Sequence, residues 1–386
     1  MPQTDAHRQQ LIVMLGAFAA FGMLFGVWQV LLADLSTALY LSPGPLGAAL
    51  SIGFVASLPA MLLGGRVADR VGARTLGVAA GAILALSLIG FALVGSYAAL
   101  VVVLLGFLAA SGVYDVAVNA AAIGLERASR RRVLTLLHAA FSGGGATGAL
   151  AAGLLIAAGI DFRWLYVATG ILVASVMLAW RLGPMPPRAA AQAPMGGASL
   201  YCSPLLLLLA VITALGFLSE GAMESWSAIY LRSSLDLPAL IGAGGVATFH
   251  AAMLVGRLGT GAIVGRLGRV ATLRSAGVAA AVGMTLALAT ELPALILLGF
   301  LVVGLALAGV APVAFSLAGD ASPGRAGQAS AVITTIGYGG FLFGPGLVGG
   351  VAELTSLRLA LAVIVAAGLG ISGLTTLLQT KRPGQR

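Results

Sequence analysis

Ionisable residues are scarce in this chain of 386 residues. Asp, Glu, Lys and Arg together make up 9% of it, against roughly a quarter in an ordinary soluble domain. Hydrophobic residues make up 60%, and they gather into recurring runs of about twenty residues, the length at which a helix crosses a bilayer. These runs do not alternate polar with apolar residues, which argues against a membrane β-barrel. We therefore expect an all-α membrane protein.

Cysteine and histidine are nearly absent as well. The single Cys202 excludes a disulfide framework and a multi-cysteine metal site. No group of His, Asp and Glu has the spacing of metal ligands, so we expect no metal. The chain also lacks a G-x-x-x-x-G-K-[ST] nucleotide-binding pattern and a nucleophile–base constellation. We therefore expect no cofactor and no enzymatic activity.

The net charge of +9 does not indicate nucleic-acid binding. Basic residues stand singly or in small groups between the apolar runs, which is typical of loops that orient a membrane protein. The first run lacks a small-residue cleavage site, so we expect it to be retained as a span. The expected spans are 11–35, 44–64, 75–95, 98–123, 134–158, 163–181, 204–230, 239–263, 271–290, 293–318, 328–350 and 357–379.

Twelve spans place both termini on one side of the membrane. Of the 21 lysines and arginines, only Arg163, Arg232 and Arg358 then fall on the opposite side. By the positive-inside rule, both termini are expected in the cytoplasm. We expect a monomer in the lipid bilayer of the bacterial inner membrane.

The longest stretch between spans is RLGPMPPRAAAQAPMGGASLYCSP. It is rich in proline, glycine and alanine and has no periodic apolar face, which is typical of a flexible tether. We therefore expect an N-terminal six-helix bundle at 1–181, a cytoplasmic linker at 182–203 and a C-terminal six-helix bundle at 204–386.

Each half carries the pattern G-x-x-x-x-R-x-G between its second and third spans. The matching residues are Gly65, Arg70 and Gly72 in the first copy, and Gly261, Arg266 and Gly268 in the second. The second copy follows the first by 196 positions, the difference between 261 and 65 and close to half the chain length. This repeat at equivalent loops predicts an internal duplication.

The segment GRVADRVGAR resembles the signature of the major facilitator superfamily, a glycine followed by an Asp-Arg pair and a second glycine. The segments DVAVNAAAIGLERASRRR, EGAMESWSAIYL and GYGGFLFGPGLVGG resemble a bacterial branch loosely akin to the fucose-permease group. The resemblance covers essentially the whole chain. It implies two pseudo-symmetric six-helix bundles around a central cavity, working by alternating access, and it does not name a substrate.

The resemblance also implies a conformational latch at the cytoplasmic ends of the bundles. Asp69 and Arg70 would form ion pairs between helices that stabilise the outward-open state. Gly265 stands where the second copy would match Asp69, so a carboxylate latch is expected only in the first half. From the residues alone, a solvated loop is the simpler interpretation.

Four of the twelve acidic residues lie inside expected spans: Asp34, Asp115, Glu220 and Glu224. A charged group at mid-helix costs about 2.5–3.5 kcal/mol to insert, so such a residue is a candidate for function. Burial disfavours the charged form of a carboxylic acid, which allows it to take up a proton. A carrier driven by a proton gradient needs a charge that can be switched in this way.

Asp115 and Glu220 are the leading candidates for proton coupling. Asn119 lies one helical turn beyond Asp115, and Glu224 one turn beyond Glu220, so each pair shares a helix face. The alternative for these residues is an interhelical hydrogen bond that only holds a bundle together. Asp34 is near the outer end of the first span, which favours a helix-end or outer-mouth role over coupling.

Three further residues complete the candidate substrate and proton site. Gln29 is a neutral polar group at membrane depth, Tyr338 is a polar aromatic residue in span eleven, and His250 in span eight has a side chain suited to proton relay. A hydrogen-bonded packing role is the alternative for His250. A salt bridge or a snorkelling position is expected for Arg257.

Glycines crowd spans five, eight and eleven. Small residues let helices approach closely and slide. The resemblance places these helices between the two bundles, so we expect their glycine faces to form a surface that repacks during transport.

These features predict a secondary active transporter that moves a small polar organic solute by alternating access, coupled to protons. No basic residue lies in the middle of spans one, four or seven, which disfavours dianionic substrates. The alternatives are an exporter of drug-like or toxic metabolites and a non-transporting membrane sensor with the same fold.

Overall fold

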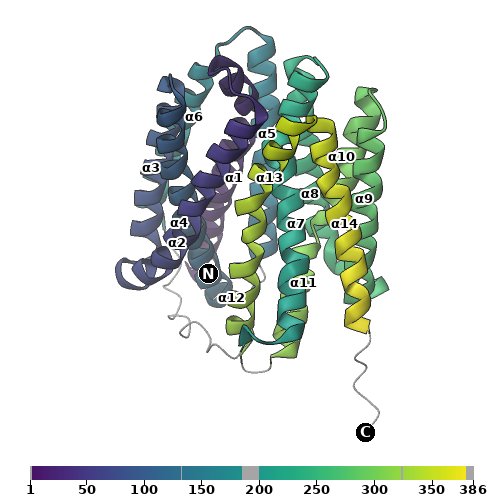
Figure 1. The fold of residues 1–386 in the computed structure, drawn as a ribbon. Coiled ribbons are helices and arrows are strands. Elements are labelled where there is room, and N and C mark those ends of the chain that lie inside the picture. The colour runs from purple at the N-terminus through teal and green to yellow at the C-terminus, as the bar shows by residue number, and fades with distance from the viewer. Residues whose placement is uncertain (1, 132, 185–199, 323–324, 380–386) are drawn as a thin grey trace.

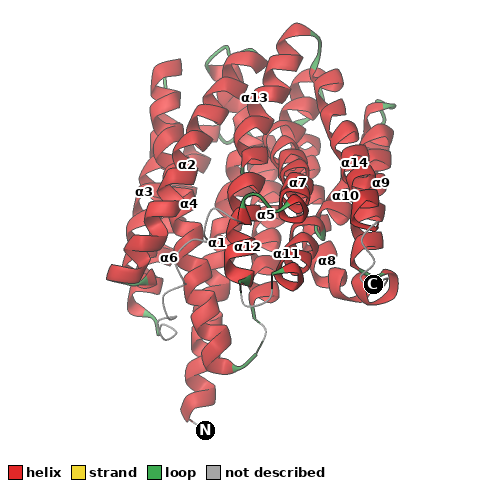
Figure 2. Cartoon of the chain, turned by 60° about the horizontal axis from the view of Figure 1, so that its bottom comes forward, coloured by secondary structure: helices red, strands yellow, loops and turns green. Residues whose placement is uncertain are grey.

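The chain folds into helices joined by short loops in the computed structural model, which describes residues 2–131, 133–184, 200–322 and 325–379 (Figures 1 and 2). The first half contains α1 (Pro2–Ala38), α2 (Pro43–Val71), α3 (Ala73–Leu93), α4 (Tyr97–Ser129), α5 (Leu134–Ala157) and α6 (Phe162–Leu182). The second half contains α7 (Pro204–Ile229), η2 (Tyr230–Ser234), α8 (Ala239–Leu267), α9 (Arg269–Leu288), α10 (Pro293–Leu307), α11 (Val310–Ala321), α12 (Ala326–Gly337), α13 (Gly339–Leu354) and α14 (Leu357–Gln379).

Twelve helical segments in this described part are long and apolar enough to cross a membrane. Each coincides with one of the twelve predicted spans, so the prediction of an all-α fold with twelve spans is confirmed. Local sequence explains several helix starts. Helix α7 begins at Pro204, where a backbone N–H is not needed, and Asp161 begins α6 by accepting a hydrogen bond from the Arg163 N–H at 2.8 Å. Most of the predicted linker, residues 185–199, lies outside the described residues.

The repeated glycine–arginine pattern is helical, which corrects its prediction as a loop. It forms the last two turns of α2 and of α8, and only the final glycine of each copy makes the turn to the next helix. Gly72 has a φ of 88° and Gly268 a φ of 78°, a conformation that a side chain with a Cβ rarely adopts. The two halves thus use the same helix–glycine–helix corner, as a duplication would produce.

Two of the twelve spans are interrupted. The tenth divides into α10 and α11, and the eleventh divides into α12 and α13 at Tyr338, with α12 drawn below α13 in Figure 1. Backbone hydrogen bonds continue across the second break, from Tyr338 N to Thr334 O at 2.9 Å and from Leu342 N to Tyr338 O at 3.1 Å. The eleventh span is therefore not unwound at Tyr338.

The two halves meet chiefly along two helix pairs, with smaller contacts of α1 with α7 and α8. Helix α5 packs against α8, and α2 packs against α13, whereas most other close contacts stay within one half, such as α1 with α5 and α9 with α14. Because the number of spans is even, the last span ends on the side where α1 begins. We call this end of the molecule, where Gly72 and Gly268 lie, the terminal end. The end marked by Ser42 and Glu353 is the far end.

The glycines of α5 serve two different interfaces. A Cβ on Gly144 or Gly148 would overlap the backbone of α1 in the same half, while one on Gly145 would lie 2.8 Å from the His250 ring of the other half. The three glycines predicted in α8, at positions 242, 244 and 245, face elements of their own half. The expectation that all these glycines lie between the bundles is therefore only partly correct, because close packing inside each bundle requires small residues as well.

Candidate functional site between the two halves

Polar side chains from both halves converge where α5 meets α8 and where α1 meets α7. Glu220 and Glu224 lie four residues apart on α7, and His250 and Arg257 lie seven apart on α8, so each pair occupies one face of its helix. These faces turn toward α1 and α5 rather than toward lipid. We call the set Gln29, Asp115, Glu220, Glu224, His250 and Arg257 the inter-half cluster.

An ion pair inside this cluster joins α7 to α8. Arg257 Nη2 lies 3.2 Å from Glu220 Oε1, and the exposed fractions of the two side chains are 21% and 13%. The same guanidinium donates from Nη1 to Ser142 Oγ at 2.7 Å, on α5 of the other half. The expected salt bridge of Arg257 is therefore present within the second half, and the hydrogen bond of the same guanidinium to Ser142 connects the two halves.

A second polar contact crosses between the halves. His250 Nε2 lies 2.8 Å from Gln29 Oε1, and both side chains are buried. Because an amide oxygen only accepts hydrogen bonds, Nε2 carries the hydrogen in this arrangement. Gln29 Nε2 is buried without a hydrogen-bond partner among the described residues, although the carboxyl group of Glu224 lies within interaction range of this amide.

Asp115 belongs to the same region from the side of α4. Asn119 Nδ2 donates at 2.9 Å both to the Asp115 carboxylate and to the Asp115 carbonyl oxygen, so the expected pairing on one helix face is observed. Within the described residues, no ion pair joins Asp115 to Glu220, so their shared role in proton coupling stays a prediction.

An aromatic wall adjoins these acids. Phe217 stacks on Phe341 with ring centroids 4.8 Å apart, and Tyr338 meets Phe217 edge-on at 5.5 Å. Phe54 of the other half stacks on Phe341 at 6.1 Å. The wall packs against α7 at Gly221, where a Cβ would lie 3.0 Å from the Phe341 ring.

Asp34 does not join the inter-half cluster. Its two carboxylate oxygens accept hydrogen bonds from Arg232 at 2.5 and 2.8 Å, toward the far end of α1 and at η2. Its place among the substrate and proton residues stays a prediction, and the alternative of a role near the helix end agrees with this geometry. The pair connects the two halves, which the sequence did not indicate.

Glu353 is a further residue that sequence reasoning missed. It lies outside the predicted spans and was not a candidate, yet its carboxylate accepts hydrogen bonds from Ser42 Oγ at 3.0 Å and from Gly44 N at 2.8 Å. It therefore caps the first turn of α2 from the opposite half. Below it, the backbones of α2 and α13 come so close that a Cβ on Gly349 would lie 2.9 Å from the Gly47 Cα. No local pattern in the sequence marks these pairings.

The predicted latch residues make no comparable contacts at the terminal end. Asp69, Arg70 and Arg266 are exposed, and no ion pair among the described residues joins them to the opposite half. The four glycines of the repeated pattern are Gly65, Gly72, Gly261 and Gly268. A Cβ added to any of them would meet no described atom within 4 Å, apart from neighbouring residues and the backbone of the same helix. The nearby ion pair of Arg269 with Asp320 stays within the second half.

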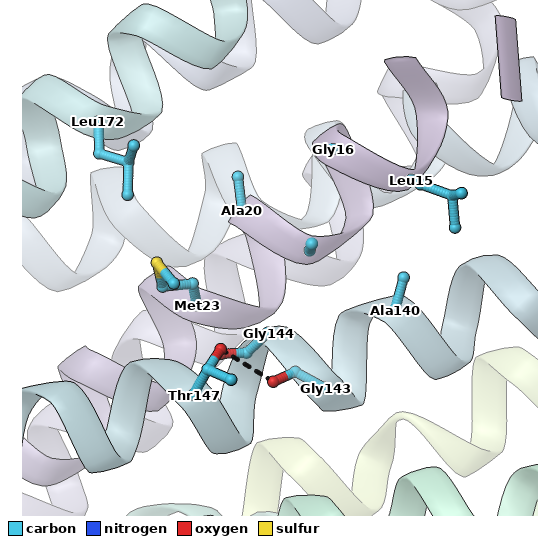
Figure 3. A pocket seen from close by; sticks show the side chains of 10 residues that line it. Leu15, Gly16, Ala20, Met23, Ala140, Gly143, Gly144, Thr147 and Leu172 are labelled. Atoms are coloured by element: carbon cyan, nitrogen blue, oxygen red, sulfur yellow. Dashed lines mark hydrogen bonds between the residues drawn. The ribbon is translucent and has the colours of Figure 1, made fainter. Parts of the chain in front are cut away.

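A pocket of about 620 Å³ lies between α1 and α5 beside Leu172 of α6 (Figure 3). Its walls are small or apolar, including Gly16, Ala20 and Met23, and Thr147 Oγ1 in its wall is bonded to the Gly143 carbonyl at 3.0 Å. No titratable side chain of the described residues lines it. Across residues 2–131, 133–184, 200–322 and 325–379, no group of three His, Cys, Asp or Glu residues is placed to hold a metal ion.

Comparisons with known proteins agree with this architecture. The family model of the Major Facilitator Superfamily matches residues 13–345. The chain belongs to this superfamily. It shares 32% identity over 356 residues with an uncharacterised MFS-type transporter of Yersinia pestis, covering 92% of each chain. It shares 26% identity with the membrane protein MosC of Rhizobium meliloti, covering 98% of this chain and 92% of that one.

Solved structures show the same fold. A point mutant of the nucleoside transporter NupG superposes with a TM-score of 0.82 at 17% identity and covers 96% of this chain and 100% of that one. A bacterial homologue of the human lysosomal transporter Spinster, in an inward-facing and occupied conformation, gives a TM-score of 0.77 at 14% identity, over 97% of this chain and 98% of that one. The two six-helix bundles of the superfamily fold are thereby confirmed. The predicted likeness to the fucose-permease group stays a prediction.

Proposed function

We propose that this transporter moves a small polar organic solute by alternating access and couples the movement to protons. The observation that carries the proposal is the inter-half cluster: carboxyl groups, a guanidinium and an imidazole lie at membrane depth on helices of both halves. Charged groups in such a place are expensive to insert and mark substrate or proton pathways in membrane proteins. The superfamily membership supports the transporter class independently of these residues.

Alternating access is supported by the unequal contacts at the two ends. At the far end, Asp34 pairs with Arg232 and Glu353 caps α2, both across the halves. At the terminal end, the pattern residues Asp69 and Arg266 are exposed and form no ion pair across the halves with any described residue. The structure therefore corresponds to a state closed at the far end, and the second state would break the far-end contacts and engage the latch around Asp69.

We infer a membrane orientation from the distribution of basic residues. The three at the far end are each engaged in an ion pair: Arg163 with Asp161, Arg232 with Asp34, and Arg358 with Glu291. By the positive-inside rule, the many arginines of the terminal end support our assignment of that end to the cytoplasmic side of a bacterial inner membrane. The state described here would then be inward-open.

Proton coupling is proposed to act through Glu220 and Asp115. A proton on Glu220 would remove its attraction to Arg257, and the guanidinium would then be held mainly by Ser142 of the other half. Protonation would thereby shift a cationic group from a contact within one half toward a contact between halves. That is a direct way for a proton to bias two arrangements of the bundles.

The test is proton movement driven by solute in proteoliposomes that contain a pH-sensitive dye. A panel of small polar solutes is added without an imposed gradient, and we expect one chemical class to cause proton flux with the wild-type protein. Glu220→Gln and Asp115→Asn should each abolish the flux, while Asp161→Asn, the same chemical change in an exposed pair, should keep it. Full flux in both cluster variants would contradict the assignment of the coupling residues.

A further inference from the structure

Helix α9 packs against α10 and α14, and one of its faces is left uncovered by both; the three helices stand together in Figure 1. Gly277 packs against α14, where an added Cβ would lie 2.5 Å from the Gly368 carbonyl oxygen. Gly283 packs against α10 in the same way, with the Gly299 carbonyl oxygen at 2.8 Å. A pocket of about 560 Å³ follows the remaining face of α9 and is bounded by Val302 of α10. We call this pocket the α9–α10 groove.

The α9–α10 groove joins one charge to an apolar wall. Arg274 and Ser275 line it near the start of α9, at the terminal end, and Val278 and Val282 line it further along. These two valines are 45% and 60% exposed. At 1.5 Å of rise per residue, Val282 lies roughly 12 Å from Arg274 along the helix axis. Because α9 is one of the segments that can span a membrane, the valines lie at the depth of acyl chains and the arginine at the depth of headgroups.

The guanidinium of Arg274 has no counter-charge in the described part of the chain. It is exposed and forms no ion pair with any described residue, and no acidic side chain of those residues lines the groove. Arg269, five residues earlier, is different because it pairs with Asp320. The Ser275 hydroxyl already donates to the Thr272 carbonyl oxygen at 3.0 Å. The groove therefore offers one uncompensated positive charge.

The first half does not carry this charge at the equivalent place. By the offset of 196 positions between the two copies of the repeated pattern, Val78 matches Arg274, since 274 less 196 is 78. Each is the sixth residue of its helix, in α3 and in α9. The arginine is therefore a feature of the second half alone, and it does not belong to the helix–glycine–helix corner that both halves share.

An anionic phospholipid matches both parts of the groove. A free phosphate ion would pair with the guanidinium and leave the valines uncovered, whereas an uncharged acyl chain would cover the valines and bring no anion. A lipid phosphate accepts two parallel N–H bonds from an arginine, and basic pockets between spanning helices on the cytoplasmic side bind anionic headgroups. We propose that the α9–α10 groove binds an anionic phospholipid, with its phosphate on Arg274 and one acyl chain along Val282 and Val302. This site is separate from the inter-half cluster and does not depend on the proposed transport function.

The test uses the purified full-length protein in a neutral detergent and probes that separate the parts of the lipid. The probes are dioleoylphosphatidylglycerol, dioleoylphosphatidylcholine, dioleoylglycerol and glycerol phosphate. Thermal unfolding is followed over a concentration series of each, because a ligand that binds only the folded state stabilises it. We expect phosphatidylglycerol to stabilise the protein more than the two lipids without net charge, and glycerol phosphate to have no effect.

Two substitutions test the two parts of the groove. Arg274→Gln should weaken the apparent affinity for phosphatidylglycerol about fivefold, the contribution of one arginine near a membrane surface. Its matched control is Arg181→Gln, an exposed arginine at the terminal end of α6 that lies outside the groove. Val282→Trp should fill the groove and weaken the binding with the arginine still in place. Its matched control is Val102→Trp, at a position on α4 that is 67% exposed.

Several outcomes would overturn the proposal. Equal stabilisation by phosphatidylglycerol and phosphatidylcholine would show that the charge of the headgroup is not recognised. Equal affinities in the two glutamine variants, or in the two tryptophan variants, would place the lipid elsewhere on the surface. A full shift with glycerol phosphate alone would make Arg274 a site for a free phosphate group and not for a lipid.

Discussion

The two ends of helix α2 make a direct comparison, because the far end lies against the other half and the last turn at the terminal end is exposed. At the far end its first turn is capped by Glu353, and Gly47 lies against α13 at backbone distance. At the terminal end its last turns, with Asp69 and Arg70, are exposed. This difference indicates that contacts at the far end hold the two halves together. Each of these contacts can be removed by a single substitution, and each removal should favour the state that is open at the far end.

The largest effect is expected where the backbones are closest. Gly349→Val would push a side chain into the Gly47 Cα and the Trp226 ring, and overpacking of this kind costs about 1–3 kcal/mol. The far end should therefore open, with a change of roughly 5- to 150-fold in the equilibrium between states. The reporter is the labelling rate of Ser51→Cys, in the α2–α13 interface, by a membrane-impermeant thiol reagent in a Cys202→Ser background.

The control for this variant is the neighbouring glycine. A Cβ on Gly350 would meet no described atom within 4 Å, outside its chain neighbours and the turn of helix around it, so Gly350→Val changes the same residue type by the same volume without entering the interface. It should leave the labelling rate unchanged. Equal labelling rates in the two valine variants would mean that the packing at Gly349 does not hold the far end closed.

An intermediate effect is expected from the ion pair at the far end. Asp34→Asn removes the charge that Arg232 binds through two nitrogens and leaves at most one acceptor. We expect the far end to open by about tenfold, or ~1.4 kcal/mol, measured with the same Ser51→Cys reporter. Asp161→Asn, in an exposed pair within the first half, is the matched control. A variant that labels like the wild type would show that the pair does not contribute to closure.

The smallest effect is expected at the terminal end. Asp69 is exposed and has no ion-pair partner among the described residues, so Asp69→Asn should leave the state described here intact and destabilise only the opposite one. An exposed ion pair contributes about 0.2–1 kcal/mol, which predicts up to about fivefold slower labelling of Ser51→Cys. Asp320→Asn, whose pair stays within the second half, is the control. Faster labelling in Asp69→Asn would exclude the latch.

The helices themselves were well predicted because hydropathy and the bilayer length determine them locally. The ends of α2 and α8 were not, since the glycines of the repeated pattern are compatible with a loop, and only Gly72 and Gly268 among them have the backbone conformation of a turn. The family fold could also be inferred, because GRVADRVGAR resembles the signature of the superfamily, and the recurrence of the pattern in both halves indicated the duplication.

The partners of the site residues could not be predicted from the sequence. Gln29 and His250 are 221 positions apart, and Gly44 and Glu353 are 309 apart. Such contacts depend on how the two halves dock, which no local pattern encodes. The sequence did show which acids lie inside the spans. Because a charged group is costly to insert into a bilayer, Asp115 and Glu220 were candidates for function before their surroundings were known.

Alternating access is tested most directly by measuring distances at both ends in the same membrane preparation. Spin labels at Tyr40→Cys and Leu354→Cys would report the far end, and labels at Val71→Cys and Leu267→Cys the terminal end, all at exposed positions, in a Cys202→Ser background. When Gly349→Val is introduced, the far-end distance should lengthen while the terminal-end distance shortens. If the far-end distance lengthened and the terminal-end distance stayed the same, the two ends would be independent and the account would be wrong.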